Sequence, residues 1–278
     1  MPELPEVRVH AERLAASHVG AVLERFEPIT FTAMKTAGVD PGRAVGSAVD
    51  TIRTRGKLFI IGVGPTSFVV HLMQGGRLVP DAKLSAKPRN GIARWRFADH
   101  DALLLTEAGK ERKAGVWVID GDPIGQDPLA GLGPDADTAD RDQLAALLTA
   151  TRVRVHGFLR DQHQLAGIGR RLANEICHTA RLSPFAITAK LGPDDVDRLH
   201  AAIGGCIDRS IAFERTQTEM VGSANRPADV HHRTGEPCPV CGDTVREIEY
   251  TSYTVNYCAT CQTNGKVLAD NTTSKFLK

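Results

Sequence analysis

Four cysteines near the carboxyl-terminal end constrain the fold of this chain more than any other feature. Cys238 and Cys241 form one Cys-x2-Cys pair, Cys258 and Cys261 form a second, and sixteen residues separate the pairs. This spacing is typical of a tetrahedral zinc site to which each pair donates two thiolates. Residues 244–257 alternate in polarity and are rich in β-branched side chains, which predicts a hairpin. We therefore expect a zinc ribbon that holds one structural Zn²⁺. Disulfides or four unrelated thiols are the alternatives.

The composition of the chain is that of a globular protein outside the membrane. It has 278 residues and a formal net charge of +1 at pH 7, so its size permits several domains and its charge says little about partners. It contains no apolar run long enough to span a membrane and no signal peptide. We expect a cytoplasmic protein that does not bind membranes. Cys177 and Cys206 fall in helical patterns and are expected in the core.

The periodicity of apolar residues changes once along the chain. Up to about residue 120, after a first helix at 7–17, short segments punctuated by Gly, Pro and Asp predict an antiparallel sandwich or barrel. From residue 140 onward the period becomes helical. The predicted strands are 21–26, 48–55, 58–63, 67–72, 92–97, 102–105 and 115–119, and the predicted helices are 141–150, 154–161, 171–180 and 193–213. The predicted fold class is α+β.

The amino terminus can carry covalent chemistry. Pro2 is small enough that removal of Met1 is expected, which leaves a secondary amine with a pKa far below that of lysine. Such an amine attacks an electrophilic carbon and forms an imine without a separate base, and Glu3 follows it as a possible proton donor. The alternative is a plain start to the first helix.

A glycine-rich turn within residues 164–175 is the second candidate site. Gly167 and Gly169 precede a predicted helix that starts near Arg170, and a helix start of this kind suits a phosphate. Residues 151–182 contain six arginines and two acidic residues, and six minus two gives a local net charge of +4, which is typical of nucleic-acid binding. The alternative is a helix–turn–helix whose arginines are merely solvated.

Four motifs together resemble one protein family across essentially the whole chain. They are MPELPEV at the start, RGK (55–57) with HLMQGGRL (71–78), LAGIG with ANE (165–175), and EPCPVCG with YCATCQ at the end. In this order they resemble the bacterial formamidopyrimidine-DNA glycosylase and endonuclease VIII family. The resemblance implies an amino-terminal helix and β-sandwich (1–133), a helix–two-turn–helix domain (134–230), a zinc finger (231–265) and a tail (266–278).

The resemblance also implies a base-excision mechanism on a nucleotide flipped out of the duplex. Pro2 would attack C1′ of the deoxyribose, and Glu3 would protonate the sugar ring oxygen. Glu6 would orient the amino terminus, and Lys57, expected on a strand, would contact a phosphate. Met73 would enter the gap that the flipped base leaves.

The sequence departs from the family pattern at several DNA-contacting positions. Tyr253 stands where the family's zinc-finger hairpin has an arginine, and a tyrosine cannot provide a forked cation. Arg170 replaces the usual asparagine after Gly169, and His156, charged only part of the time near neutral pH, replaces an expected lysine.

Two further departures affect lesion recognition. The family's Arg-Phe pair aligns with Lys113-Ala114, and Arg112 is a candidate substitute. The loop at 216–229 is short and lacks the expected Gly-Thr-Thr run. The sequence therefore does not identify which damaged base the protein recognises.

We expect a monomeric, nucleoid-associated DNA glycosylase with abasic-site lyase activity that acts on damaged DNA, in duplex form. An abasic-site lyase without base excision and a non-catalytic damaged-DNA-binding protein are the alternatives.

Overall fold

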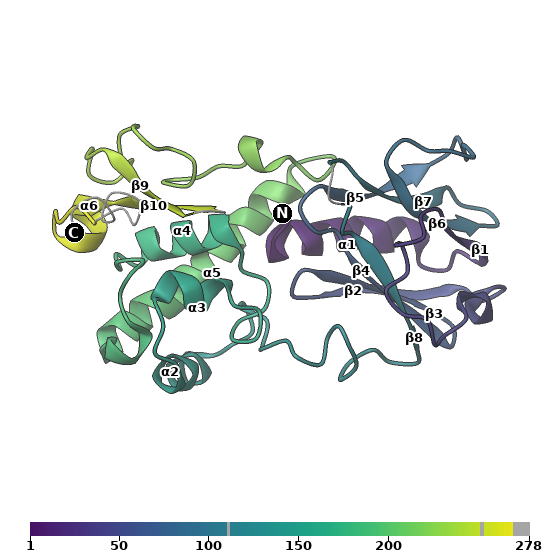
Figure 1. The fold of residues 1–278 in the computed structure, drawn as a ribbon, viewed down its shortest axis with the longest axis horizontal. Helices are drawn as coiled ribbons and strands as arrows, with labels where there is room; N and C mark the ends of the chain where they lie inside the picture. Colours follow the sequence, from purple (N-terminus) through teal and green to yellow (C-terminus); the bar gives the residue numbers. More distant parts are fainter. Residues whose placement is uncertain (110–111, 251–252, 269–278) are drawn as a thin grey trace. The chain divides into compact units, whose positions relative to one another are not determined.

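The chain folds into two compact units, Met1–Gly131 and Leu132–Lys278, each described here by itself. The structure is a computed structural model that describes residues 1–109, 112–250 and 253–268 (Figure 1). Most of the predicted tail, 269–278, therefore lies outside the described residues, and the finer domain boundaries stay predictions. Within the described ranges, none of the helices has the length and apolarity needed to cross a membrane.

The first unit consists of one helix and two four-stranded antiparallel sheets (Figure 1). Helix α1 spans Leu4–His18 and packs against β2 and β3. One sheet has the order β1-β6-β7-β5 and the other β2-β3-β4-β8. The strands are β1 (Leu23–Pro28), β2 (Val49–Arg55), β3 (Leu58–Val63), β4 (Thr66–His71), β5 (Gly76–Asp81), β6 (Gly91–Phe97), β7 (Ala102–Glu107) and β8 (Gly115–Asp120), with a 3-10 turn at Pro41–Ala44.

Aromatic side chains from both sheets meet in the core between them. Phe26 of β1 and Trp95 of β6 have ring centroids 5.0 Å apart, and Phe68 of β4 lies 5.1 Å from Phe26. Phe68 and Trp95 are fully buried. This contact between the sheets confirms the predicted sandwich.

Two elements differ from the sequence-based expectation because of proline. Helix α1 begins at Leu4 rather than at residue 7, since Pro5 lies in the first turn, where its missing N–H has no helical partner to lose. Strand β5 was not predicted because Pro80 interrupts it. It forms the edge of its sheet, where a missing backbone donor is tolerated.

The second unit combines helices with a carboxyl-terminal hairpin (Figure 1). Helix α4 packs against α3, α5 and β10, and it therefore lies at the centre of this unit. The elements are α2 (Arg141–Ala150), α3 (Val155–Arg160), α4 (Arg170–Thr179), α5 (Pro193–Arg215), β9 (Val245–Tyr250), β10 (Tyr253–Cys258) and α6 (Ala259–Thr263), with 3-10 turns at Thr188–Lys190 and Ser223–Asn225. The predicted α+β class is confirmed, with the sandwich, the helices and the ribbon following one another in chain order.

Candidate functional site

Three residues at the start of the chain, Pro2, Glu3 and Glu6, are buried. Glu3 and Glu6 are only 4% and 1% exposed. The Glu3 N–H donates to the Glu6 carboxylate at 2.6 Å, and the Val7 N–H donates to the Glu3 carbonyl at 3.1 Å. These bonds fix the direction in which the chain enters the helix, as in a capping box. The structure therefore places Pro2, whose nitrogen becomes an amine once Met1 is removed, next to two carboxylates at the start of α1.

Lys57 lies in the turn between β2 and β3, which corrects the expectation that it lies on a strand. It is 5% exposed and lies between Arg55 and Leu58, which pair with each other across the two strands. Leu58 in turn pairs with His71 at the end of β4. Burial, and secondarily the charge of Lys57, lowers the pKa of His71 to about 4. The His71 imidazole is therefore neutral at neutral pH.

Met73 adopts a backbone conformation that few side chains tolerate. Its φ is +52°, and its N–H donates to Nδ1 of His71 at 2.9 Å. A non-glycine residue in the left-handed region is strained, and such strain is often found at functional sites. Met73 is half-buried, so part of its side chain is accessible.

A buried carboxylate that the sequence did not single out, Glu107, holds the backbone at Ala114. Glu107 is 4% exposed and accepts a hydrogen bond from the Ala114 N–H at 2.6 Å. A lone acid at the end of an apolar strand was the signal that could have revealed it. Arg112 is exposed with φ +42° and lies 3.4 Å from Oδ1 of Asn90. Lys110 and Glu111, part of the same predicted segment, lie outside the described residues.

The turn between α3 and α4 is held by one amide side chain. Gln162 donates to the carbonyls of Arg160 and Ile168 at 2.7 and 2.9 Å and accepts from the Gly167 N–H at 2.9 Å. Gly167 has φ +106°, which favours glycine. Gly169 is the N-cap of α4, without a side-chain cap, and Arg170 is exposed beside it. The arrangement leaves the first turn of α4 suited to an anion.

The tip of the hairpin packs on helix α3 through rings and guanidinium groups. Tyr253 stacks on Tyr250 with centroids 4.7 Å apart, and Cζ of Arg160 lies 4.0 Å from the Tyr253 centroid. His156 is 3% exposed, and its ring is parallel to Tyr253 at 6.2 Å. Burial, and secondarily Arg160, lowers the pKa of His156 to about 3. The ring is therefore neutral at pH 7, which corrects the expectation that it is charged part of the time.

The four cysteines converge as the spacing predicted. Their sulfur atoms all lie within 4.8 Å of one another, with Cys238 and Cys261 3.9 Å apart and Cys241 and Cys258 3.4 Å apart. Zinc–sulfur bonds of about 2.3 Å place tetrahedral sulfurs about 3.8 Å apart, so the four residues fit a structural zinc ion. The predicted zinc site is confirmed. Cys177 and Cys206 are buried elsewhere, as expected.

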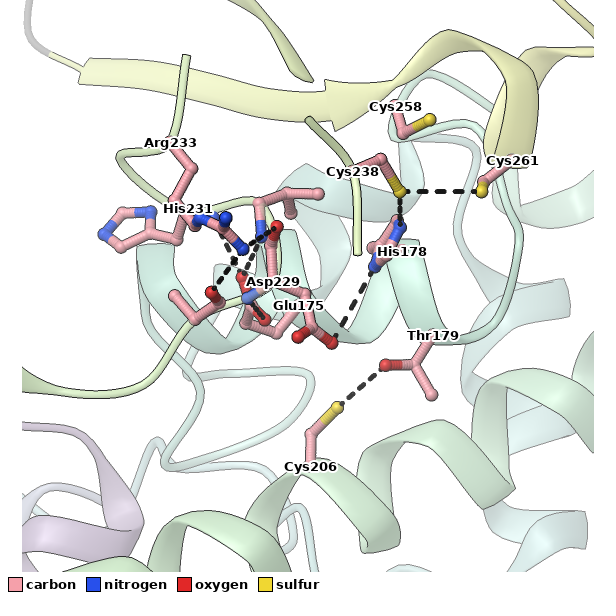
Figure 2. Close-up of polar contacts among 12 residues, drawn as sticks. Glu175, His178, Thr179, Cys206, Asp229, His231, Arg233, Cys238, Cys258 and Cys261 are labelled. Atoms are coloured by element: carbon pink, nitrogen blue, oxygen red, sulfur yellow. Dashed lines mark hydrogen bonds and ion pairs between the residues drawn. The ribbon is translucent and has the colours of Figure 1, made fainter. Parts of the chain in front are cut away.

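Helix α4 contacts this zinc site and the segment that leads to it (Figure 2). Nε2 of His178 lies 3.3 Å from the Cys238 sulfur. The Glu175 carboxylate accepts the N–H groups of Asp229, Val230 and His231 at 2.6, 3.1 and 2.9 Å. Glu175 belongs to the predicted ANE motif, but its role as an anchor of the zinc finger was not predicted.

Comparison with known proteins assigns a family domain to each region of the chain. Residues 1–116 match the formamidopyrimidine-DNA glycosylase N-terminal domain, and residues 125–221 match the formamidopyrimidine-DNA glycosylase H2TH domain. Residues 235–264 match a zinc finger found in FPG and IleRS.

Individual relatives agree with these matches. The formamidopyrimidine-DNA glycosylase of Chloroflexus aurantiacus is 30% identical over 94% of this chain and 98% of its own length. An uncharacterized formamidopyrimidine-DNA glycosylase-like protein of Mycobacterium tuberculosis is 42% identical over 53% of this chain and 94% of its own. The structure of Lactococcus lactis formamidopyrimidine-DNA glycosylase bound non-covalently to DNA with an abasic site has a TM-score of 0.82, at 21% identity, and covers 94% of this chain and 99% of that one.

Proposed function

Since this chain belongs to the formamidopyrimidine-DNA glycosylase family, we propose that it removes damaged bases from DNA and cleaves the abasic site that results. The observation that carries this proposal is the buried group of Pro2, Glu3 and Glu6, in which the Glu6 carboxylate holds the Glu3 N–H at 2.6 Å. An amine and a carboxylic acid adjacent in the chain are the two groups that the reaction needs.

The chemistry starts once Met1 has been removed. The Pro2 nitrogen attacks C1′ of the deoxyribose, and the bond to the base breaks with its electron pair going to the base, which takes up the proton that the nitrogen loses. Glu3 protonates the sugar ring oxygen. The ring opens and the nitrogen and C1′ form an iminium ion. Loss of a C2′ proton then expels the 3′ phosphate, which cuts the strand on the 3′ side of the lesion.

Lys57 supplies positive charge to the same unit. We assign it to a phosphate near the lesion, because it is buried beside a His71 ring that stays neutral at neutral pH. Met73 is assigned to the gap that the flipped nucleotide leaves. Its strained backbone and half-buried side chain support this role.

A second function, abasic-site cleavage without base excision, is favoured by the residues at the lesion-reading positions. Arg112 is exposed and lies 3.4 Å from the Asn90 side chain, and Tyr253 has no cationic group of its own. An abasic site needs the imine chemistry but no recognition of a base.

Trapping with borohydride tests the proposal, since this reagent reduces the imine and fixes the enzyme to DNA. We expect a covalent adduct with abasic duplex DNA and with at least one member of a panel of damaged bases. Pro2→Gly and Glu3→Gln should abolish base release, and Glu12→Gln, an exposed carboxylate on the same helix, should leave it unchanged.

The outcomes separate the functions. Cleavage of abasic DNA alone, with every damaged base ignored, would select the lyase. No adduct on any substrate, combined with DNA binding that Pro2→Gly leaves intact, would refute both and select a non-catalytic binding protein. Mass spectrometry of the amino terminus checks that Met1 is removed.

A further inference from the structure

Two arginines and three aromatic residues form a cluster at the hairpin tip that we call the hairpin arginine cluster. It consists of Arg154, Arg160, Phe185, Tyr250 and Tyr253. Cζ of Arg160 lies 4.0 Å from the Tyr253 centroid, and Cζ of Arg154 lies 4.2 Å from the Phe185 centroid. Arg154 also donates to the Tyr250 hydroxyl at 2.8 Å, and the Tyr250 and Phe185 rings meet edge to face at 6.5 Å.

The two guanidinium groups have no carboxylate partner in the part of the chain that the structure describes. Other arginines of the second unit do: Arg141 bonds Asp197 at 2.8 Å, and Arg226 bonds Glu214 at 2.9 Å. The imidazole of His156, whose pKa is lowered to about 3 by burial and secondarily by Arg160, is neutral at pH 7 and does not add to the charge. The cluster therefore carries two positive charges that no described ion pair neutralises.

A cation–π contact leaves the hydrogen-bonding capacity of an arginine largely unused. A guanidinium whose central carbon lies over a ring does not need its five N–H donors for that contact. Only the Arg154 bond to Tyr250 uses one of these donors among the described contacts. A planar fork held in advance in one orientation is suited to the oxygens of a phosphodiester.

The same geometry argues against nucleobase stacking on Tyr253. The Tyr253 ring is stacked on Tyr250 with centroids 4.7 Å apart, and the Arg160 guanidinium lies over it at 4.0 Å. A base that stacked on Tyr253 would have to compete with these two contacts. The groups of the cluster that can still bind a ligand are therefore its two guanidinium groups.

We propose that Arg160, together with Arg154, binds a phosphodiester of the DNA strand, and that Tyr253 supports Arg160 rather than contacting the DNA. The cation that the hairpin lacks at Tyr253 is supplied by helix α3. The inference rests on the proposed function only in taking DNA as the ligand.

The salt dependence of binding tests this assignment. The dissociation constant for a duplex that carries a tetrahydrofuran abasic analogue is measured by fluorescence anisotropy from 50 to 300 mM KCl. Each phosphate contact contributes about 0.9 to the slope of log affinity against log salt. We expect Arg160→Ala to reduce the slope by about 0.9, and the double variant with Arg154→Ala to reduce it more than Arg160→Ala alone. Arg141→Ala, which removes the paired arginine of α2, should leave the slope unchanged.

Variants of Tyr253 distinguish support of Arg160 by the Tyr253 ring from direct contact of Tyr253 with the DNA. Tyr253→Phe keeps the ring and should retain the slope, whereas Tyr253→Leu removes the ring and should reproduce Arg160→Ala. Equal slopes for Arg160→Ala and Arg141→Ala would overturn the proposal, as would a loss in Tyr253→Phe as large as in Tyr253→Leu. Zinc content near one per chain checks the fold of each variant.

Borohydride trapping on abasic DNA keeps this proposal distinct from the enzymatic one. If the wild type forms no adduct but Arg160→Ala reduces the slope, the enzymatic function is refuted and the phosphate site is supported. If the wild type forms an adduct but Arg160→Ala leaves the slope unchanged, the phosphate site is refuted and the enzymatic function is supported.

Discussion

At the scale of single residues, the start of α1 combines a helix cap with the candidate chemistry. The Glu6 carboxylate accepts the Glu3 N–H at 2.6 Å, and both side chains are at least 96% buried. A group that satisfies a buried N–H in this way contributes to stability and fixes the position of the residue that carries it. Glu6 should therefore affect both the folding and the orientation of Glu3 and Pro2.

Replacing Glu6 separates these effects. Glu6→Ala leaves the Glu3 N–H buried without its acceptor, and we expect it to lower the free energy of unfolding by about 1–2 kcal/mol and to slow adduct trapping about tenfold. Glu6→Gln keeps an acceptor oxygen and should lose less of both. Urea denaturation and single-turnover trapping measure the two quantities. Glu24→Gln, an exposed carboxylate on β1, is the control, and trapping by Glu6→Ala as fast as by this variant would contradict the role.

At the scale of elements, α4 joins two parts of the second unit. Its amino-terminal turn carries Gly169 and the exposed Arg170, and its later turns carry Glu175 and His178, which contact the zinc-finger segment. Nε2 of His178 lies 3.3 Å from the Cys238 sulfur, the geometry of an imidazole N–H that donates to a zinc-bound thiolate. One rigid helix thus positions a candidate phosphate site and a metal site.

Removing the imidazole should weaken zinc retention without removing a ligand. We expect His178→Ala to bind one zinc ion and to release it to a chelating dye about tenfold faster, because hydrogen bonds to metal ligands raise metal affinity by about 10- to 100-fold. His200→Ala is the matched control, since His200 lies on α5 and bonds the Ala139 carbonyl. Equal release rates in the two variants would show that the contact with Cys238 does not stabilise the site.

The elements that could be predicted from sequence are those whose signal is local. The cysteine pairs, the hairpin between them and helix α2 each follow from spacing or periodicity within about 20 residues. Contacts between distant segments could not be predicted, because no local pattern records them. Arg160 meets Tyr253 from 93 positions away, since 253 − 160 = 93, and Glu175 holds backbone beyond position 228. Lys57 carried no sign of its burial either.

At the scale of the whole molecule, both units contain histidines that are held neutral. Burial lowers the pKa of His71 in the first unit to about 4, and the pKa values of His156 and His231 in the second unit to about 3. In an unfolded chain these side chains would titrate near 6.5. Above that pH both states are neutral, and below it the unfolded chain binds protons that the folded chain does not. Acid should therefore destabilise each unit from pH 6.5 downward.

His71 allows this effect to be measured in one unit alone, because both tryptophans, Trp95 and Trp117, belong to the first unit. We expect the free energy of unfolding, followed by tryptophan fluorescence in urea, to fall between pH 7 and pH 5, with about 2 kcal/mol of the fall due to His71. His71→Asn can still accept the Met73 N–H and has no titrating ring, so it should lack that part of the fall. His100→Asn, which replaces an exposed histidine, should retain it. Parallel pH profiles for the wild type and His71→Asn would show that the His71 imidazole is protonated in the folded protein within this range.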